Sequence, residues 1–295
     1  MEEPVRVALA EAVAVLPVGE GWWYEPKFDG HRAVLIRDAA GARLQSRSGR
    51  IVTSWWMDIA LPAMALLPGT VLDGELVIWR GGALDFGAVQ SRAASSPARA
   101  RTLAEGLPAA YAVWDCLSHP LHGDVRGRPY LERRAFLLDV LADIQPPIQA
   151  VPASDDVGTA RDWYDSLRPL GIEGVVCKRA SSPYRPGRVW VKVRHSEPVD
   201  AVVVGFTGPR PRALVVRLPD GRRALSHRLT APLAARAAEL LPESGTSRFA
   251  STRDGERYAE SGPGLVAEVL AGSTRHRSVT VTRLLPAEKD LESNK

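Results

Sequence analysis

A lysine lies inside an apolar run near the start of the chain and is followed closely by an acid and a glycine. The segment 21–38 reads GWWYEPKFDGHRAVLIRD and places Lys27, Asp29, Gly30 and Arg32 close together. A lysine in an apolar strand ordinarily buries its stem and extends its ammonium group to water. Neighbouring cations lower the pKa of a desolvated lysine, and the free amine attacks carbonyls or phosphorus. Lys27 is therefore a candidate nucleophile.

Further charged residues interrupt apolar runs downstream. They are Asp73 and Glu75 in VLDGELVIW, Asp115 in YAVWDCL, Glu173 and Lys178 in GIEGVVCKR, and Lys192 and Arg194 in VWVKVR. Lys192 and Arg194 are two positions apart, so both lie on one face of a strand. Because a buried unpaired charge costs several kcal/mol, this recurrence indicates one convergent charged site, although Asp73 alone would also fit a turn cap. Cations with metal-holding carboxylates are what phosphoryl chemistry needs.

Apolar runs of strand length recur along the first two thirds of the chain. They are rich in Val, Ile and Trp, and they predict strands at 33–36, 71–78, 110–114, 174–177 and 189–193. Apolar residues at helical spacing predict helices over 132–144 and 159–170, the second closed by Gly171. The Ala/Ser/Arg-rich stretch 90–108 is expected to be a loop with one short helix.

The pattern changes after residue 196. Short apolar runs with Gly or Pro turns cover 201–208, 213–222 and 224–229, a helix candidate covers 231–241, and two more runs cover 264–272 and 278–285. Several short strands with one helix in about 95 residues predict a small β-barrel. The polar residues 287–295 are expected to fray.

The composition is that of a soluble globular protein, with 45% hydrophobic and 24% charged residues in 295. The net charge of +4 permits an anionic partner. Cys116 and Cys177 lie in apolar runs and are expected to be inert core thiols in a reducing compartment. The first ten residues lack the apolar core of a secretory signal, and no apolar run approaches the roughly 18 residues of a membrane span. We therefore expect a cytoplasmic protein without membrane contact.

The ordered set of motifs resembles that of the covalent nucleotidyltransferases, which include ATP- and NAD-dependent DNA ligases, RNA ligases and mRNA capping enzymes. The matching segments, in the family's order, are KFDG at 27–30, SRSG at 46–49, DGEL at 73–76, WD at 114–115, EGVVCK at 173–178 and WVKVR at 190–194. EPKFDGHR and DGELV are most similar to ATP-dependent DNA ligases. The resemblance covers nearly the whole chain and is to the compact bacterial accessory type represented by ligase C.

The resemblance implies a role for each motif residue. Lys27 is the expected nucleophile, and Lys192 and Arg194 are expected to hold the α-phosphate and support catalysis. The other expected contacts are Glu25 at the adenine edge, Arg32 at the ribose or triphosphate, Arg47 at the nick phosphate, Glu75 at the ribose and metal, Trp114 stacked on the adenine, and Glu173 on the metal. The implied cofactors are ATP and Mg²⁺ or Mn²⁺. Family members usually have lysine at the position of Arg194. Of the family's last motif, RxDK, this chain retains Arg283, which is expected to orient the pyrophosphate.

The fold class that the resemblance implies is α+β. A nucleotidyltransferase (adenylation) domain with antiparallel sheets and flanking helices is expected over 1–196, followed by an OB-fold barrel over 197–295. The implied activity is sealing of nicks between 3′-hydroxyl and 5′-phosphate ends of double-stranded DNA through lysyl-AMP, in DNA repair, by a monomer that meets repair-pathway proteins. Two alternatives stay open: an RNA ligase or capping-type nucleotidyltransferase, and a nucleic-acid-binding module with a decayed site.

Overall fold

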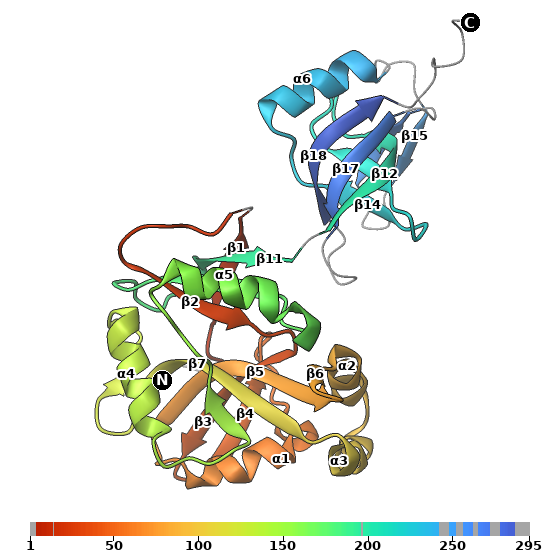
Figure 1. The fold of residues 1–295 in the computed structure, drawn as a ribbon. Coiled ribbons are helices and arrows are strands. Elements are labelled where there is room, and N and C mark those ends of the chain that lie inside the picture. The colour runs from red at the N-terminus through yellow and green to blue at the C-terminus, as the bar shows by residue number, and fades with distance from the viewer. Residues whose placement is uncertain are drawn as a thin grey trace, which may run out of the picture. The chain divides into compact units, whose positions relative to one another are not determined.

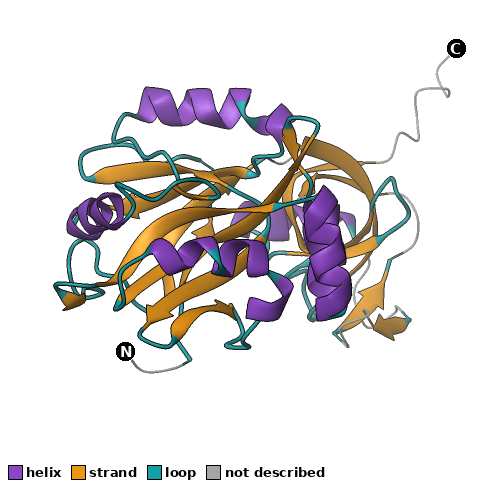
Figure 2. Cartoon of the chain, turned by 90° about the horizontal axis from the view of Figure 1, so that it is seen from below, coloured by secondary structure: helices purple, strands orange, loops and turns teal. Residues whose placement is uncertain are grey.

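The computed structural model describes residues 4–13, 15–195, 197–241, 248–251, 256–261, 265–271 and 278–286. The chain divides into two compact units, Met1–His195 and Ser196–Lys295, each described by itself (Figure 1). Strands make up most of the regular structure, and helices flank them (Figure 2). Within these ranges, no helix is long and apolar enough to cross a membrane.

The first unit is built from two sheets and several helices. Its strands are β1 (Ala8–Ala12), β2 (Trp22–Lys27), β3 (His31–Asp38), β4 (Gly41–Ser46), β5 (Thr70–Arg80), β6 (Ala83–Leu84), β7 (Ala109–His119), β8 (Gly123–Asp124), β9 (Ile148–Ala150), β10 (Gly174–Arg179) and β11 (Gly187–Arg194). Its α-helices are α1 (Met57–Ala60), α2 (Phe86–Ala94), α3 (Pro97–Gly106), α4 (Tyr130–Val140) and α5 (Val157–Ser166), and its short 3₁₀ segments are Thr53–Trp55, Pro62–Ala65 and Arg168–Leu170.

The two sheets of the first unit pack face to face. The small sheet has the order β1-β11-β10-β2, and the large sheet has the order β4-β3-β5-β7-β8, with β6 and β9 added beside β5 and β7. Side chains alternate along β3, so Val34 and Ile36 pack between the sheets, whereas Ala33 and Leu35 face the core under α1, α2 and α4. The other face of the small sheet is covered by α5. Apolar layers thus lie on both faces of the small sheet.

The second unit is a closed barrel. Its elements are β12 (Glu197–Phe206), β13 (Leu214–Arg217), β14 (Arg223–Ser226), α6 (Ala231–Leu240), β15 (Phe249–Ser251), β16 (Arg257–Glu260), β17 (Leu265–Ala271) and β18 (Ser278–Pro286). The path β12-β13-β14-β18-β17 returns to β12, with β14 and β18 parallel and the other neighbours antiparallel. The interior is apolar, and α6 lies beside β18 (Figure 1). The predicted small β-barrel is confirmed.

Most predicted elements of the first unit are present. The helix predicted over 159–170 is α5 with the 3₁₀ turn after it; Asp156 caps its start, and Gly171, at φ 83°, closes that turn. The prediction of one short helix over 90–108 is wrong, because α2 and α3 occupy 86–106. Asp85 and Ser96 each accept a backbone N–H at a helix start, and this capping outweighs the weak periodicity. Residues 287–295, expected to fray, lie outside the described residues.

Candidate functional site

The candidate residues of β2 and β11 share one face of the small sheet. Directly paired residues in adjacent strands point to the same side, and successive residues alternate. Two paired rows cross this face: Glu25–Val176–Lys192 and Lys27–Gly174–Arg194. The opposite face carries Tyr24, Val175 and Cys177, which pack with α5. The register of three strands therefore brings together side chains from both ends of the first unit's sequence.

Lys27 ends β2, and its ammonium group forms an ion pair with Oε2 of Glu173. The other carboxylate oxygen of Glu173 lies 2.9 Å from Nε of Arg194. The backbone N–H of Glu173 also donates to the Lys27 carbonyl at 2.8 Å. The Lys27 side chain is 18% exposed, so it is in part accessible to a ligand.

Gly174 explains how β10 and β11 come so close beside this pair. Its φ is 147°, and a Cβ atom at this position would lie 2.0 Å from the Val193 carbonyl oxygen. A larger residue would separate the strands that carry Glu173 and Arg194. The glycine after Glu173 is therefore a geometric requirement of the site.

Lys192 and Arg47 extend the positive charge around Lys27. Burial, together with the nearby cations Arg194, Lys27 and Arg47, lowers the pKa of Lys192 to about 8, and Glu173 partly opposes this shift. We call Lys27, Arg47, Lys192 and Arg194, together with Glu173, the cation cluster. It contains more cations than carboxylates, and such an excess favours a bound polyanion.

Glu75 approaches Lys27 from the large sheet. Its Oε1 accepts the Gly30 N–H at 3.0 Å, and the charges of Lys27 and Arg32 act on its carboxylate. Burial raises the pKa of the Glu75 carboxyl to about 7, and the two cations oppose that rise. A Cβ atom on Gly30 would lie 2.2 Å from the Leu76 carbonyl oxygen, so glycine is needed for the Lys27 loop to lie against β5.

Arg32 is held by protein groups between the sheets. Its guanidinium donates to both carboxylate oxygens of Asp73, at 3.0 and 2.5 Å, and to the Ala8 carbonyl at 2.6 Å. Burial lowers the pKa of Arg32, but the adjacent Asp73 more than offsets this, and the net shift is upward. Asp73 is fully buried inside β5 and is the partner of Arg32, so the alternative reading of a turn cap is wrong.

Trp114 and Glu25 both contact the buried lysine Lys178. The Trp114 ring lies 5.2 Å from the Arg32 guanidinium carbon, and its carbonyl accepts from Lys178 Nζ at 3.1 Å. The Glu25 carboxylate accepts from Lys178 at 2.8 Å and from the Tyr130 hydroxyl at 2.6 Å. Glu25 is 2% exposed, so its carboxylate is engaged by protein donors.

Arg283 is the candidate residue that belongs to the second unit. It lies exposed on β18, in register with Glu268 of β17. The other candidates, from β2, β3, the turn after β4, β5, β7 and the β10–β11 pair, belong to the first unit.

A second charged group, which we call the buried network, contains one residue with an expected role, Glu25, and four residues to which the sequence motifs gave none. It consists of Glu25, Asp115, Tyr130, Arg133 and Lys178, each nearly or fully inaccessible to solvent. One signal was present in the sequence: Tyr130, Arg133 and Leu137 have helical spacing, so Arg133 occupies the buried stripe of α4. An arginine in such a stripe requires a buried acidic partner.

Comparisons with known proteins agree on one family. The sequence profile of the ATP-dependent DNA ligase domain matches residues 7–194. DNA ligase C2 of Mycolicibacterium smegmatis is 38% identical over 205 residues, which are 69% of this chain and 57% of the relative. DNA ligase C of Mycobacterium tuberculosis is 36% identical over 209 residues, 69% of this chain and 58% of the relative. The chain thus spans less than two thirds of the length of these curated relatives.

A solved structure extends the likeness over both units. The mycobacterial DNA ligase D complexed with ATP and MES is 26% identical, covers 96% of both chains, and has a TM-score of 0.53. Together with the profile match over more than half of the residues, these findings show that the chain belongs to the ATP-dependent DNA ligase family.

Proposed function

We propose that this chain is an ATP-dependent DNA ligase that seals nicks between 3′-hydroxyl and 5′-phosphate ends in DNA repair, through a lysyl-AMP intermediate. The observation that carries the proposal is the ion pair of Lys27 with Glu173 inside the cation cluster. Attack on a polyphosphate requires a nucleophile and positive charge around the phosphate. The Lys27 amine would be the nucleophile, and the neighbouring cations would supply the positive charge.

In the first step, Nζ of Lys27 forms a bond to the α-phosphorus of ATP as the bond to pyrophosphate breaks. Before the attack, Lys27 must lose a proton, and the Glu173 carboxylate that contacts Nζ can accept it. Lys192 and Arg194 share the sheet face of Lys27 and would stabilise negative charge on the α-phosphate. Arginine carries that charge as well as lysine does, but it does not give up a proton. Of the two residues that would hold the α-phosphate, we therefore propose that Lys192, and not Arg194, donates a proton during the reaction.

A divalent cation fits this site only if it shares its coordination with the nucleotide. Among the described residues, no group of three or more His, Cys, Asp or Glu side chains could hold a metal ion. Mg²⁺ commonly takes one or two carboxylates and completes its shell with water and substrate phosphates. Glu75 and Glu173, which approach Lys27 from the two sheets, would be those carboxylates for Mg²⁺ or Mn²⁺. The cation would offset phosphate charge.

We assign the remaining first-unit candidates to the nucleotide and the nick. Trp114 would stack on the adenine, with Glu25 near its edge, and Arg32 and Glu75 would lie by the ribose. Asp73 already holds Arg32, and Lys178 already holds Glu25. These partners would keep the two side chains in position for the nucleotide. Arg47 is the exposed member of the cation cluster and would bind the phosphate of the nick.

We further propose that residues 1–196 form the adenylation domain and residues 197–295 an OB-fold domain. The closed path β12-β13-β14-β18-β17, with β14 and β18 parallel and α6 after β14, supports the OB assignment. Arg283 would orient the pyrophosphate leaving group. The substrate partner is nicked double-stranded DNA, and the enzyme acts as a monomer that meets repair-pathway proteins.

Covalent labelling tests the proposal. The protein is incubated with Mg²⁺ or Mn²⁺ and with ATP, GTP or NAD carrying label in the transferred nucleotide, and it is then run on a denaturing gel. Label from ATP, with subsequent sealing of a nicked duplex, is expected. Label from GTP would favour a capping-type enzyme, sealing of RNA but not DNA would favour an RNA ligase, and no label would overturn the enzymatic proposal.

A further inference from the structure

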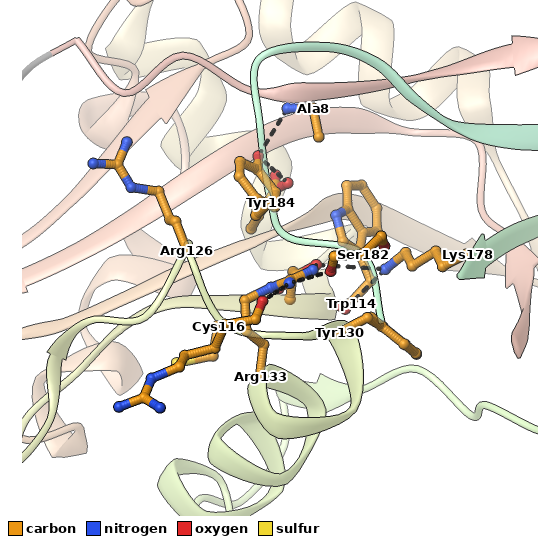
Figure 3. A network of polar contacts seen from close by, with 12 residues as sticks. Ala8, Trp114, Cys116, Arg126, Tyr130, Arg133, Lys178, Ser182 and Tyr184 are labelled. Atoms are coloured by element: carbon orange, nitrogen blue, oxygen red, sulfur yellow. Dashed lines mark hydrogen bonds and ion pairs between the residues drawn. The ribbon is translucent and has the colours of Figure 1, made fainter. Parts of the chain in front are cut away.

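The buried network is complete in hydrogen bonds and balanced in charge. Lys178, 1% exposed, contacts the Glu25 carboxylate at 2.8 Å, the Trp114 carbonyl at 3.1 Å and the Asp115 carboxylate at 3.8 Å. Arg133 donates to both oxygens of Asp115, at 2.7 and 3.0 Å. Figure 3 shows Lys178 and Arg133 approaching the Trp114 strand from different elements.

Stability alone does not account for such a network. Replacing a buried ion pair by apolar residues of similar volume is often neutral or stabilising, because the charges lose their hydration on burial. What the network adds is geometry, since its hydrogen bonds have fixed lengths and directions. It joins β2 through Glu25, β7 through Trp114 and Asp115, β10 through Lys178, and α4 through Tyr130 and Arg133.

Lys178 is the member that spans the two sheets at the site. It contacts the Glu25 carboxylate on the Lys27 strand and, on the opposite sheet, the Trp114 carbonyl and the Asp115 carboxylate. Glu25 is two residues from Lys27 on the same face of β2. The ammonium also lies 4.4 Å from the Trp190 ring centroid, which limits the positions it can adopt.

We propose that Lys178 is a positioning residue for the nucleotide: it sets the distance between the wall that carries Lys27 and the wall that carries Trp114. The inference rests on the proposed ligase function and deepens it. With Lys178 in place, the site is formed before the nucleotide arrives. Without it, nucleotide binding must first fix the two walls, and that cost weakens binding of ATP without changing the reacting groups.

The test measures KM for ATP and the rate at saturating ATP in lysyl-AMP formation. Lys178→Met alone leaves Glu25 charged and buried, so it also lowers stability. The decisive comparison is therefore Glu25→Gln against Glu25→Gln/Lys178→Met, because residue 25 is uncharged in both variants and Asp115 keeps its pair with Arg133 in both. We expect Lys178→Met to raise KM at least tenfold in that background, with a change of less than threefold in the saturated rate.

A matched control removes the neighbouring pair instead. Arg133→Met/Asp115→Asn deletes two charges of the same network that contact neither Glu25 nor the Trp114 carbonyl directly. A merely structural role for the network predicts equal changes in KM from both deletions, whereas positioning by Lys178 predicts a change below twofold from this control.

The outcomes separate the two proposals. Wild-type protein that takes up no label from ATP overturns the ligase function, and this inference with it. Wild-type protein that is labelled, together with a KM that Lys178→Met leaves within twofold or a control that matches its effect, overturns the role of Lys178 alone.

Discussion

The first unit contains two groups of buried or half-buried charges that differ in one respect. In the buried network, Lys178 and Arg133 balance Glu25 and Asp115, and every charge has a partner. In the cation cluster, four cations outnumber the one carboxylate, Glu173, and the Lys27 and Arg194 side chains are 18 and 19% exposed. A group whose charges are paired and buried can only fix the positions of its own residues. A group with excess positive charge and access to solvent can bind an anion. Charge balance and access therefore separate the supporting residues from the reacting ones.

The largest effect is expected at the nucleophile. Lys27→Ala should abolish covalent attachment of AMP, because it removes the amine that contacts Glu173 and forms the bond to phosphorus. Arg194 remains to pair with Glu173, so the fold should persist. The measurement is label on a denaturing gel together with a thermal melt.

Lys27→Arg is the matched control, because it keeps the charge but offers no amine that deprotonates. It should also remain unlabelled. Uptake of label by either folded variant would show that the reacting lysine lies elsewhere.

Breaking the buried network should cost stability rather than chemistry. Arg133→Met leaves Asp115 charged and buried with only Lys178 at 3.8 Å, and loss of one partner of a buried pair costs about 3–5 kcal/mol. Urea unfolding should show this loss, while the labelling rate per folded molecule changes less than threefold. Arg101→Met, on an exposed position of α3, should leave the unfolding free energy within about 0.5 kcal/mol.

A large loss of labelling rate in folded Arg133→Met protein, with stability unchanged, would contradict the distinction between the two groups.

Removing a cation from the cation cluster should slow the reaction and leave the stability of the fold unchanged. Lys192→Met should slow lysyl-AMP formation by roughly 10²–10³-fold, the usual effect of losing one donor to transition-state charge. Stability should not fall, because burial and neighbouring cations already disfavour the Lys192 charge. Single-turnover labelling and urea unfolding measure the two effects.

The pH profile provides the control for this variant. The pKa of Lys192 is about 8, so it is charged below that pH and loses its proton above it. The wild-type labelling rate should therefore contain a fall above about pH 8 that Lys192→Met lacks. A fall of the same size in both proteins would assign that titration to another group.

The smallest expected effect concerns Glu75. Burial raises its folded-state pKa from 4.5 to about 7, so its contribution to stability is present below pH 4.5 and is lost as pH rises through 7. Glu75→Gln cannot ionise, and its amide oxygen can still accept the Gly30 N–H. The variant should be more stable than wild type at pH 8, by about 1–3 kcal/mol, and equal to it near pH 4.

Thermal melts at pH 8 and pH 4 test this prediction, with Glu105→Gln on the exposed face of α3 as the control that should not change. Labelling should be slower in Glu75→Gln despite its greater stability. If the variant were less stable than wild type at pH 8, the contact of ionised Glu75 with the Lys27 loop would stabilise the fold by more than the burial of its charge destabilises it.

The strands and the cation cluster could be predicted from the sequence better than the buried network could. Lys27 and Lys192 interrupt apolar strands, and Glu173 directly precedes one. Strand alternation places Lys192 and Arg194 on one face without knowledge of the fold. The pairing of β2 with β10 could not be derived from the residues, because its partners are far apart in the chain. The contacts of Lys178 with Glu25 and Trp114 depend on that pairing, so the lysine's position was visible but its partners were not.

The register of the small sheet also has a consequence for how the protein is made. Lys27 and Glu173 are 146 positions apart, and β1 pairs with β11 across a still longer separation. A ribosome adds about 5–20 residues per second, so roughly 7 to 30 s pass between synthesis of the lysine and synthesis of its carboxylate partner. During that interval β2 has neither β10 nor the Glu173 pair, and its edge is open to wrong pairing. The nucleophile is thus translated early, but its surroundings assemble only when the ribosome has passed residue 194.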